Sequence, residues 1–211
     1  MKRVIALLLV AGAAALAEAP QTIALSKPAT GGGMPMMQAL AERRSAREFA
    51  PAPLAPGTLS NLLWAAYGVN RPDGHRTAPS ANNRQTVDVY VVLPEGAYLY
   101  SFKEHRLDLV AAGDLRPLAG TQDFVAGAPL NLVFVADLAR FANASDQDKA
   151  TFTGVEAGAI SQNVYLFCAS EGLNTVVRAS VDRAALGKAL KLRPEQRIVV
   201  AQTVGHGKGA R

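Results

Sequence analysis

The sequence predicts an α+β fold in which a central mixed β-sheet is flanked by helices. Two observations carry this prediction. Segments with helical spacing and segments with strand spacing both occur, but they do not alternate regularly as βαβ units would. In addition, no internal repeat or second domain boundary interrupts the 211 residues, which are enough for one domain with a full core.

The first residues are typical of a secretory signal peptide. Met1-Lys2-Arg3 forms a basic start, residues 4–16 are an almost unbroken apolar run, and Ala17-Glu18-Ala19 fits a small-x-small cleavage site. The apolar run is short for a bilayer span, which favours cleavage after residue 19 over an uncleaved membrane anchor. We therefore expect a periplasmic or secreted protein with no stable membrane insertion after cleavage. Residues 20–34 are expected to form a flexible leader, and residues 35–211 the domain.

Four segments have helical character. Residues 36–43 follow a proline, and residues 58–67 place leucines at helical spacing before a glycine that suits a C-cap. Residues 154–170 are apolar on nearly all sides with small residues interleaved, which predicts a fully buried helix, either in the core or at a subunit interface. A last helix is predicted over residues 182–190, with Asp182 as its N-cap.

Four further segments are predicted to be strands. Residues 86–93 alternate apolar and varied side chains, and residues 97–102, which follow a Pro-Glu-Gly turn, are predicted to be their hairpin partner. Residues 130–136 form a continuous apolar run, which is typical of a buried central strand. Residues 197–204 form the last strand.

Composition and motifs exclude several kinds of site. The formal net charge of +5 is mild and no long basic run occurs, so nucleic-acid binding is not favoured. The single Cys168 excludes an intramolecular disulfide, and its apolar neighbours indicate a buried, inert thiol. His75, His105 and His206 are far apart and lack metal-ligand spacing. No nucleophile elbow, dinucleotide-binding fingerprint or P-loop occurs.

A dense arginine cluster is the first candidate site. Arg43, Arg44 and Arg47 surround Ser45. If the preceding helix continued, positions 43 and 47 would share a face and 44 would project roughly 100° away. An anion lying across the helix end could then meet guanidinium groups from two directions. A solvated basic helix end is the alternative interpretation.

Two further polar segments could complete such a site. Residues 76–85 ("RTAPSANNRQ") are rich in amide side chains, which both donate and accept hydrogen bonds and therefore suit a flat heterocycle with carbonyl and imide edges. Lys208 and Arg211 lie at the end of the chain. An ordinary turn and a solvated tail are the alternatives for each segment alone, and the joint occurrence of all three favours a site.

Five motifs occur in a fixed order along the chain: "ERRSAREF", "LLWAAYGVNR", "RTAPSANNRQ" before a strand, "GAISQNVYLFCASEGLNT" and "VVAQTVGHGK". This order resembles the nitroreductase superfamily of FMN-dependent oxidoreductases. Within the superfamily the chain is most similar to the compact branch related to SagB-type dehydrogenases, from Met36 to Lys208. The resemblance implies a nitroreductase-like fold, a homodimer, non-covalent FMN, and hydride or electron transfer through flavin N5 to or from a small organic substrate, with no catalytic side chain needed for the redox step.

The resemblance also implies a role for each segment. The FMN phosphate and ribityl chain would be held by Arg43, Arg44, Ser45 and Arg47. The loop at the isoalloxazine edge would contain Pro79, Ser80, Asn83 and Gln85. A backbone N–H directed towards flavin N5 and O4 would come from Ala179 or Ser180. The basic residues closing on the phosphate would be Lys208 and Arg211.

Departures from the family pattern leave the substrate open. Thr86-Val87 stands where the family often has Pro-Trp, Gly205-His206-Gly207 stands for Gly-Tyr-Pro, and the region 141–154 is short where larger members roof the substrate. A dehydrogenase for a peptide-derived ring and a non-catalytic flavin- or ligand-binding protein stay as alternatives. An exported enzyme would not meet the cytoplasmic NAD(P)H pool, so a quinol, a small redox protein or a reduced organic molecule is expected as electron donor.

Overall fold

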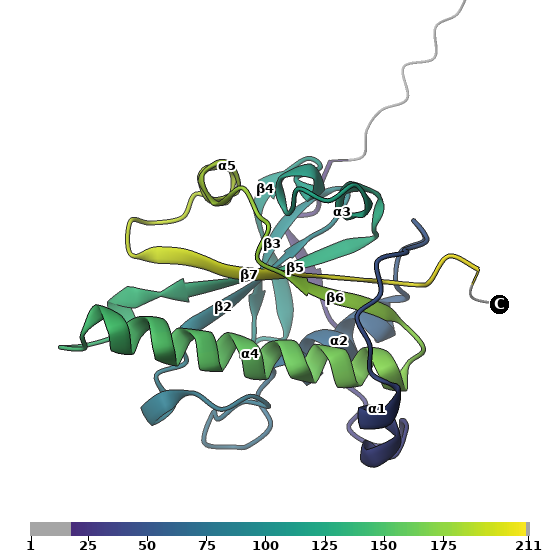
Figure 1. The fold of residues 1–211 in the computed structure, drawn as a ribbon, viewed down its shortest axis with the longest axis horizontal. Coiled ribbons are helices and arrows are strands. Elements are labelled where there is room, and N and C mark those ends of the chain that lie inside the picture. Colours follow the sequence, from purple (N-terminus) through teal and green to yellow (C-terminus); the bar gives the residue numbers. More distant parts are fainter. Residues whose placement is uncertain (1–17, 210–211) are drawn as a thin grey trace, which may run out of the picture.

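The computed structural model describes residues 18–209, which form one central β-sheet covered by helices on both faces (Figure 1). Within these residues the sheet has seven strands in the order β1-β4-β3-β2-β5-β7-β6. The strands are β1 (Thr22–Ala24), β2 (Val87–Val92), β3 (Gly96–Ser101), β4 (Arg106–Ala112), β5 (Leu130–Asp137), β6 (Asn174–Arg178) and β7 (Gln196–Gly205). The predicted α+β class is confirmed.

The prediction of a mixed sheet is wrong, because every neighbouring pair of these strands is antiparallel. β2, β3 and β4 follow one another as hairpins, whose tight turns force antiparallel pairing. β5 and β6 run in the same direction and are joined through a long helix, but β7 lies between them. The insertion of β7 removes the one parallel contact that this connection could have made.

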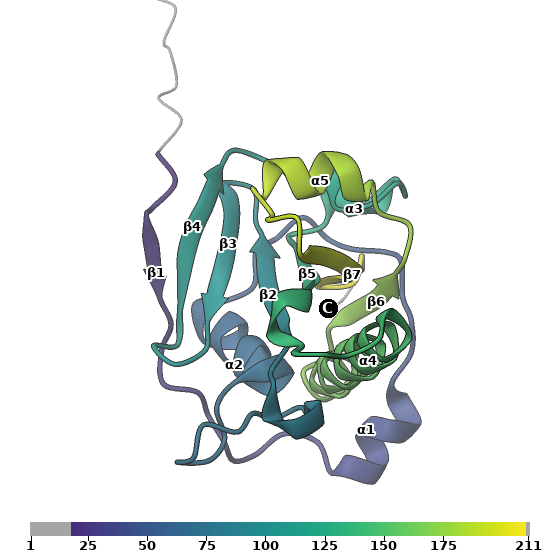
Figure 2. The same cartoon turned by 90° about the vertical axis from the view of Figure 1, so that its left-hand side faces the viewer.

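Helices cover the two faces unequally (Figures 1 and 2). One face carries α1 (Met36–Glu42), α2 (Pro56–Tyr67) and α4 (Asp146–Ser170). The other carries α3 (Phe124–Gly127) and α5 (Arg183–Ala189). Short 3₁₀ turns occur at Ala81–Asn83, Arg116–Leu118 and Leu138–Arg140. No helix of the described residues is long and apolar enough to cross a membrane.

The alternation of side chains along the central strands divides the core into two layers. In β5, Leu132 and Phe134 pack towards α2 and α4, whereas Val133 and Val135 pack towards α5. All eight residues of β5 are buried, which explains why its sequence is apolar without alternation. The predicted hairpin of β2 and β3, the central strand β5 and the last strand β7 are all confirmed.

The helices confirm the predictions in position but not always in length or burial. α5 begins with Asp182 as its N-cap, and the side chain of Asp182 accepts a hydrogen bond from the N–H of Ala185. α4 begins at Asp146, eight residues earlier than expected, because Ser145 caps its first turn. α4 is not fully buried in the single chain: Val155 is 63% exposed, and Gly158 also faces outward.

The segment expected to be a flexible leader takes part in the fold. β1 adds an edge strand to β4, with Ile23 opposite Leu107. Beyond it, the hydroxyl of Ser60 on α2 donates to the backbone oxygen of Ser26 at 2.5 Å. Main-chain pairing of this kind is invisible in a segment without apolar periodicity. Residues 1–17 lie outside the described residues, so the signal peptide stays a prediction.

Candidate functional site

The arginine cluster lies on an extended segment instead of a helix. α1 ends at Glu42, and the C-cap Arg43 already has a ψ of 131°. The following residues run beside β6 and the end of β7: Ala46 N–H donates to Thr175 O at 2.9 Å, and Ala50 N–H donates to His206 O at 2.8 Å. Figure 1 shows this dark blue segment rising from α1 past β6. The helical face expected for positions 43 and 47 therefore does not exist, although Arg43 and Arg44 both lie near Tyr165.

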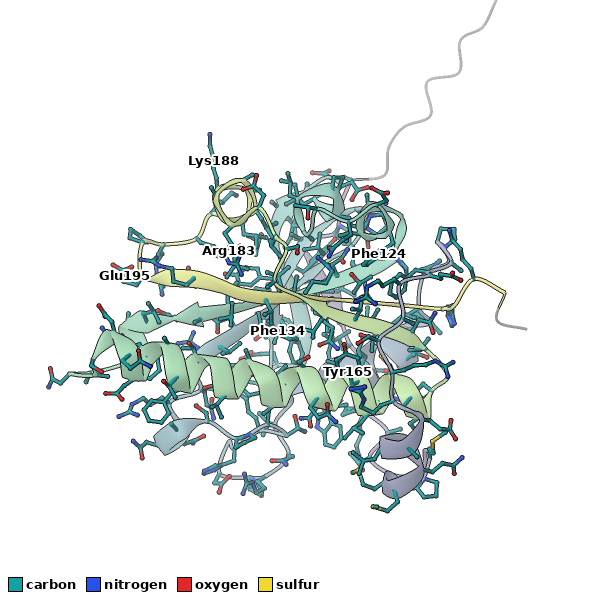
Figure 3. All side chains as sticks on the ribbon, viewed as in Figure 1. Phe124, Phe134, Tyr165, Arg183, Lys188 and Glu195 are labelled. Carbon is teal, nitrogen blue, oxygen red and sulfur yellow. The ribbon has the colours of Figure 1, made fainter. Side chains whose placement is uncertain are left out.

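Tyr165 of α4 joins three parts of this place. Its hydroxyl lies 2.7 Å from the Ser45 hydroxyl and accepts a hydrogen bond from the Val177 N–H at 3.0 Å. The guanidinium of Arg43 lies 5.0 Å from the centre of its ring, within cation–π range. Figure 3 shows Tyr165 on the part of α4 next to β6. Tyr165 thus fixes the arginine segment (residues 43–50) against both the long helix and the sheet, a role that the sequence did not reveal.

The cations at this place are available for an anion. Arg44, Arg47 and Lys208 are exposed and Arg43 is half-buried. Within residues 18–209, none of these four side chains forms an ion pair with a carboxylate. Guanidinium and ammonium groups without a carboxylate partner are the donors that bind phosphate.

The chain's path after β7 brings the residues just before Lys208 against the arginine segment. Gly205, at the end of β7, lies so close to Pro129 that an added Cβ would come within 2.6 Å of the proline ring. His206 then pairs with Ala50 of the arginine segment. The structure therefore brings the first and third predicted segments together. Arg211 lies outside the described residues.

The amide loop (residues 76–85) is held from inside by a buried carboxylate. Glu156 of α4 accepts hydrogen bonds from Val87 N–H at 2.9 Å, Thr86 Oγ1 at 2.9 Å and Ser80 Oγ at 2.6 Å. The hydroxyl of Tyr67 also donates to it. Burial and the negative charge of Glu156 raise the pKa of Tyr67, so this phenol stays a donor. Glu156, like Tyr165, was not found by sequence reasoning, because a single glutamate inside a helix carries no motif.

The four predicted residues of this loop divide into two kinds. Ser80 donates to Glu156 and accepts from Gln85 N–H at 2.8 Å, and the Gln85 side chain donates to Gly74 O at 2.9 Å. Ser80 and Gln85 therefore shape the loop from within. Pro79 and Asn83 are exposed, and Asn83 has a positive φ of 52°, which turns the chain sharply at this point. Pro79 and Asn83 are the side chains that face outward.

Ala179 and Ser180 follow directly after β6 and are both exposed. Ser180 O accepts a hydrogen bond from Thr121 N–H at 3.2 Å, which ties this turn to the opposite face of the sheet. Since Val177 contacts Tyr165, the end of β6 lies next to the arginine segment. The backbone after β6 is thus positioned beside the cation cluster.

Within one chain, the amide loop and the arginine segment contact different positions of α4. Ser80 contacts Glu156, whereas Ser45 contacts Tyr165, on the same helix. With a rise of about 1.5 Å per residue, these two positions are roughly 13 Å apart along α4. The predicted site is therefore divided into two parts, one near the middle of the long helix and one near its C-terminal end.

The comparisons with known proteins agree with this geometry. The family model described as the nitroreductase family matches residues 40–206. The chain belongs to the nitroreductase family. A protein of Methanocaldococcus jannaschii named as a nitroreductase is 35% identical over 147 residues, covering 65% of this chain and 74% of the relative.

Solved nitroreductase structures have the same fold. A crystal structure of a protein of Ralstonia eutropha JMP134, also named as a nitroreductase, is 44% identical, covers 90% of both chains and superposes with a TM-score of 0.86. The NADPH:FMN oxidoreductase of Vibrio harveyi, solved with NAD⁺, is 21% identical and covers 82% of this chain and 69% of its own, with a TM-score of 0.62. Membership makes this chain a nitroreductase-family oxidoreductase with the nitroreductase fold.

Proposed function

We propose that this protein is an FMN-dependent oxidoreductase that transfers hydride or electrons to or from a small organic substrate outside the cytoplasm. The observation that carries the proposal is the cluster of Arg43, Arg44, Arg47 and Lys208, none of which is paired with a carboxylate of the described residues. When bound, FMN would supply hydride transfer at its N5 atom. The residues present fit this group, which we propose is held non-covalently.

The phosphate would be bound by the four cations together with Ser45. Arginine forks bind phosphate oxygens in pairs, and the Ser45 hydroxyl already lies in place against Tyr165 at 2.7 Å. Tyr165 would hold Ser45 in this position through the contact between the two hydroxyl groups. The backbone of Ala179 and Ser180, anchored through Thr121, would orient the ring system beside the cluster.

We further propose that the site is completed by a second copy of the chain. The amide loop with Pro79 and Asn83 is attached to α4 roughly 13 Å from the point that holds the arginine segment, and no hydrogen bond or ion pair of the described residues joins the two parts. A two-fold axis near α4 would bring the loop of one protomer to the arginines of its partner. Exposed large apolar side chains flank this face of the single chain: Met36, Met37, Leu40, Phe152 and Val155. Sedimentation of a single monomeric species at micromolar concentration would contradict the homodimer.

We also propose that the protein works in the periplasm or after secretion, and that its electron donor is not NAD(P)H. The basic and apolar segment at residues 1–19 supports export. The Vibrio harveyi relative is named for NADPH, so reduction by NADPH is the informative comparison. Steady flavin reduction by NADPH at the rate of cytoplasmic nitroreductases would contradict this part of the proposal.

Within the family we propose the compact SagB-type branch. The 3₁₀ turn at Leu138–Arg140 is followed by only a short connection before α4 begins at Asp146. This connection leaves little chain for a roof over the substrate. The class of substrate is then best found by offering small nitroaromatic, quinone and heterocyclic compounds to the flavin-loaded protein and recording reoxidation.

The decisive experiment for the cofactor is the absorption spectrum of the purified mature protein. We expect the near-ultraviolet and visible absorption bands of a flavin, and we expect denaturation to release free FMN because the binding is non-covalent. The double variant Arg44→Ala/Arg47→Ala should weaken FMN binding, since each lost charge-assisted hydrogen bond costs about 1.5–3 kcal/mol. Arg106→Ala at the start of β4, whose exposed side chain pairs with Asp108, is the matched control. If the purified protein contains no flavin and binds none on addition, the proposed function is wrong.

A further inference from the structure

Arg178, the last residue of β6, is buried with only neutral partners. Its side chain is 5% exposed. Nη1 donates to Ala119 O at 2.7 Å, Nη2 donates to Asn131 Oδ1 at 2.8 Å, and both Nε and Nη2 donate to Thr203 Oγ1. Burial lowers the pKa of Arg178 to about 10, so the guanidinium is still protonated at neutral pH.

Two partly buried arginines, Arg140 and Arg116, are arranged differently, whereas Arg76 is also 5% exposed and likewise forms no ion pair within the described residues. Arg140 donates to both oxygens of Asp88 at 2.8 Å, and Arg116 pairs with Asp114 at 2.7 Å. Arg178 forms no such pair within the described residues. A buried charge without a counter-ion is costly, because neutral dipoles replace its hydration only in part. The charge of Arg178 is therefore uncompensated from nearby.

This charge lies directly behind the candidate FMN site. Val177, the preceding residue, donates its N–H to Tyr165, which contacts Ser45. On the other face of the sheet, the guanidinium lies 6.0 Å from the centre of the Phe124 ring, and Phe124 lies 5.5 Å from Phe49, next to the arginine cluster. Figure 3 shows Phe124 on the side of the sheet opposite Tyr165. The end of β6 thus separates a buried cation from the place where the cofactor would bind.

We propose that Arg178 acts as a fixed positive charge that raises the reduction potential of the bound flavin. This inference rests on the proposed FMN site. Reduction adds negative charge to the flavin, and a nearby buried cation favours the reduced form. Salt cannot screen a buried charge as it screens Arg44 or Lys208 on the surface. Arg178 does not contact the reacting atoms, and its effect on the flavin is purely electrostatic. Its backbone leads directly into the turn at Ala179.

The test measures the midpoint potential of bound FMN by anaerobic titration with a reference dye. Arg178→Met removes the charge, and Asn131→Asp neutralises it by placing a carboxylate at the atom now 2.8 Å from Nη2. At a fixed potential, both variants should lower the ratio of reduced to oxidised flavin about tenfold. This change corresponds to a midpoint potential about 30 mV lower for a two-electron couple. Arg178→Lys keeps the charge and should change the ratio less than about twofold, as should the exposed control Arg106→Met.

The possible results distinguish a failure of the proposed role of Arg178 from a failure of the proposed FMN site. Wild-type potentials in both Arg178→Met and Asn131→Asp would overturn the role of the charge while leaving the FMN site in place. If Arg178→Met fails to fold, Asn131→Asp still gives the answer, because it retains the guanidinium and its hydrogen bonds to Ala119 and Thr203. A lowered potential in Arg178→Lys as large as that in Arg178→Met would show that the geometry matters and the charge does not. A wild-type protein that binds no FMN would refute the proposed function itself.

Discussion

We expect the Glu156→Ala variant to unfold at a much lower denaturant concentration than the wild-type protein. The amide loop should detach from α4 before the rest of the fold is lost. Glu156 is 2% exposed and accepts hydrogen bonds from Tyr67, Ser80, Thr86 and the Val87 N–H. Its carboxylate connects α4, α2, the amide loop and β2. Few single side chains of the fold hold so many elements at one point.

The magnitude follows from the donors left behind. Tyr67, Thr86 and Val87 are each at most 1% exposed, so water cannot replace the lost acceptor. Three buried donors without partners would cost roughly 3–9 kcal/mol at about 1–3 kcal/mol each. Removal of the buried carboxylate offsets part of this cost, since its own desolvation is relieved. We therefore expect a net loss of about 3–5 kcal/mol in the free energy of unfolding, and a smaller loss of about 1–2 kcal/mol for Glu156→Gln, which keeps one acceptor oxygen.

Urea unfolding followed by circular dichroism measures this loss, with an unchanged m-value as the sign of a true change in stability. Glu171→Ala is the matched control, because Glu171 belongs to the end of the same helix and is exposed. Trypsin should also cut faster after Arg84, which lies in the loop that Glu156 holds through Ser80. Equal midpoints for Glu156→Ala and Glu171→Ala, or an unchanged rate of cleavage after Arg84, would refute the reasoning.

Two further predictions concern contacts of the leader and of the arginine segment. Burial lowers the pKa of His105. As the pH falls below about 6.5, the unfolded chain therefore binds a proton at this histidine more readily than the folded protein does, and the free energy of unfolding should decrease. His105→Asn, which tolerates the φ of 47°, should remove that part of the slope between about pH 7.5 and 5.5, and an unchanged slope in urea titrations would contradict it. Tyr165→Phe removes the hydroxyl that joins Ser45 to Val177 and should cost about 1–3 kcal/mol in urea unfolding, while Tyr98→Phe, whose hydroxyl has no partner in the described residues, should cost less than about 0.5 kcal/mol. Equal losses in the two tyrosine variants would show that the Tyr165 hydroxyl does not fix the segment.

The elements that the sequence predicted well are those whose burial is one-sided or complete. β2 places Val87, Val89 and Val91 in one core layer and Tyr90 in the other, so its alternation reports its surroundings directly. β5 is buried on both faces and its run is continuous. In such elements the packing partner dictates the residue type, and the periodicity can be read without knowing the partner.

Elements at the sheet edges were missed for the opposite reason. β1 pairs through its main chain and has two exposed residues of three, so few side chains report its position. β6 contains Thr175 and Arg178, which look unlike a buried strand. Both are nevertheless buried, because Thr175 donates to Thr203 O at 2.8 Å and Arg178 has its own neutral acceptors. Polar side chains satisfied by distant partners carry no local pattern.

The same limit governs the site. Arg43, Arg44, Arg47 and Lys208 could be found because a surface that binds an anion must present charge, and charge is visible in the sequence. Tyr165 of α4 holds the arginine segment through Ser45, and Glu156 of the same helix holds the amide loop through Ser80. Both are distant in sequence from the segments they fix, and neither belongs to a motif. Tyr165 and Glu156 fix the two halves of the proposed site at separate points of one rigid helix. Any motion of α4 relative to the sheet must therefore move both halves, so substitutions in this helix should change FMN affinity even where they do not touch the cofactor.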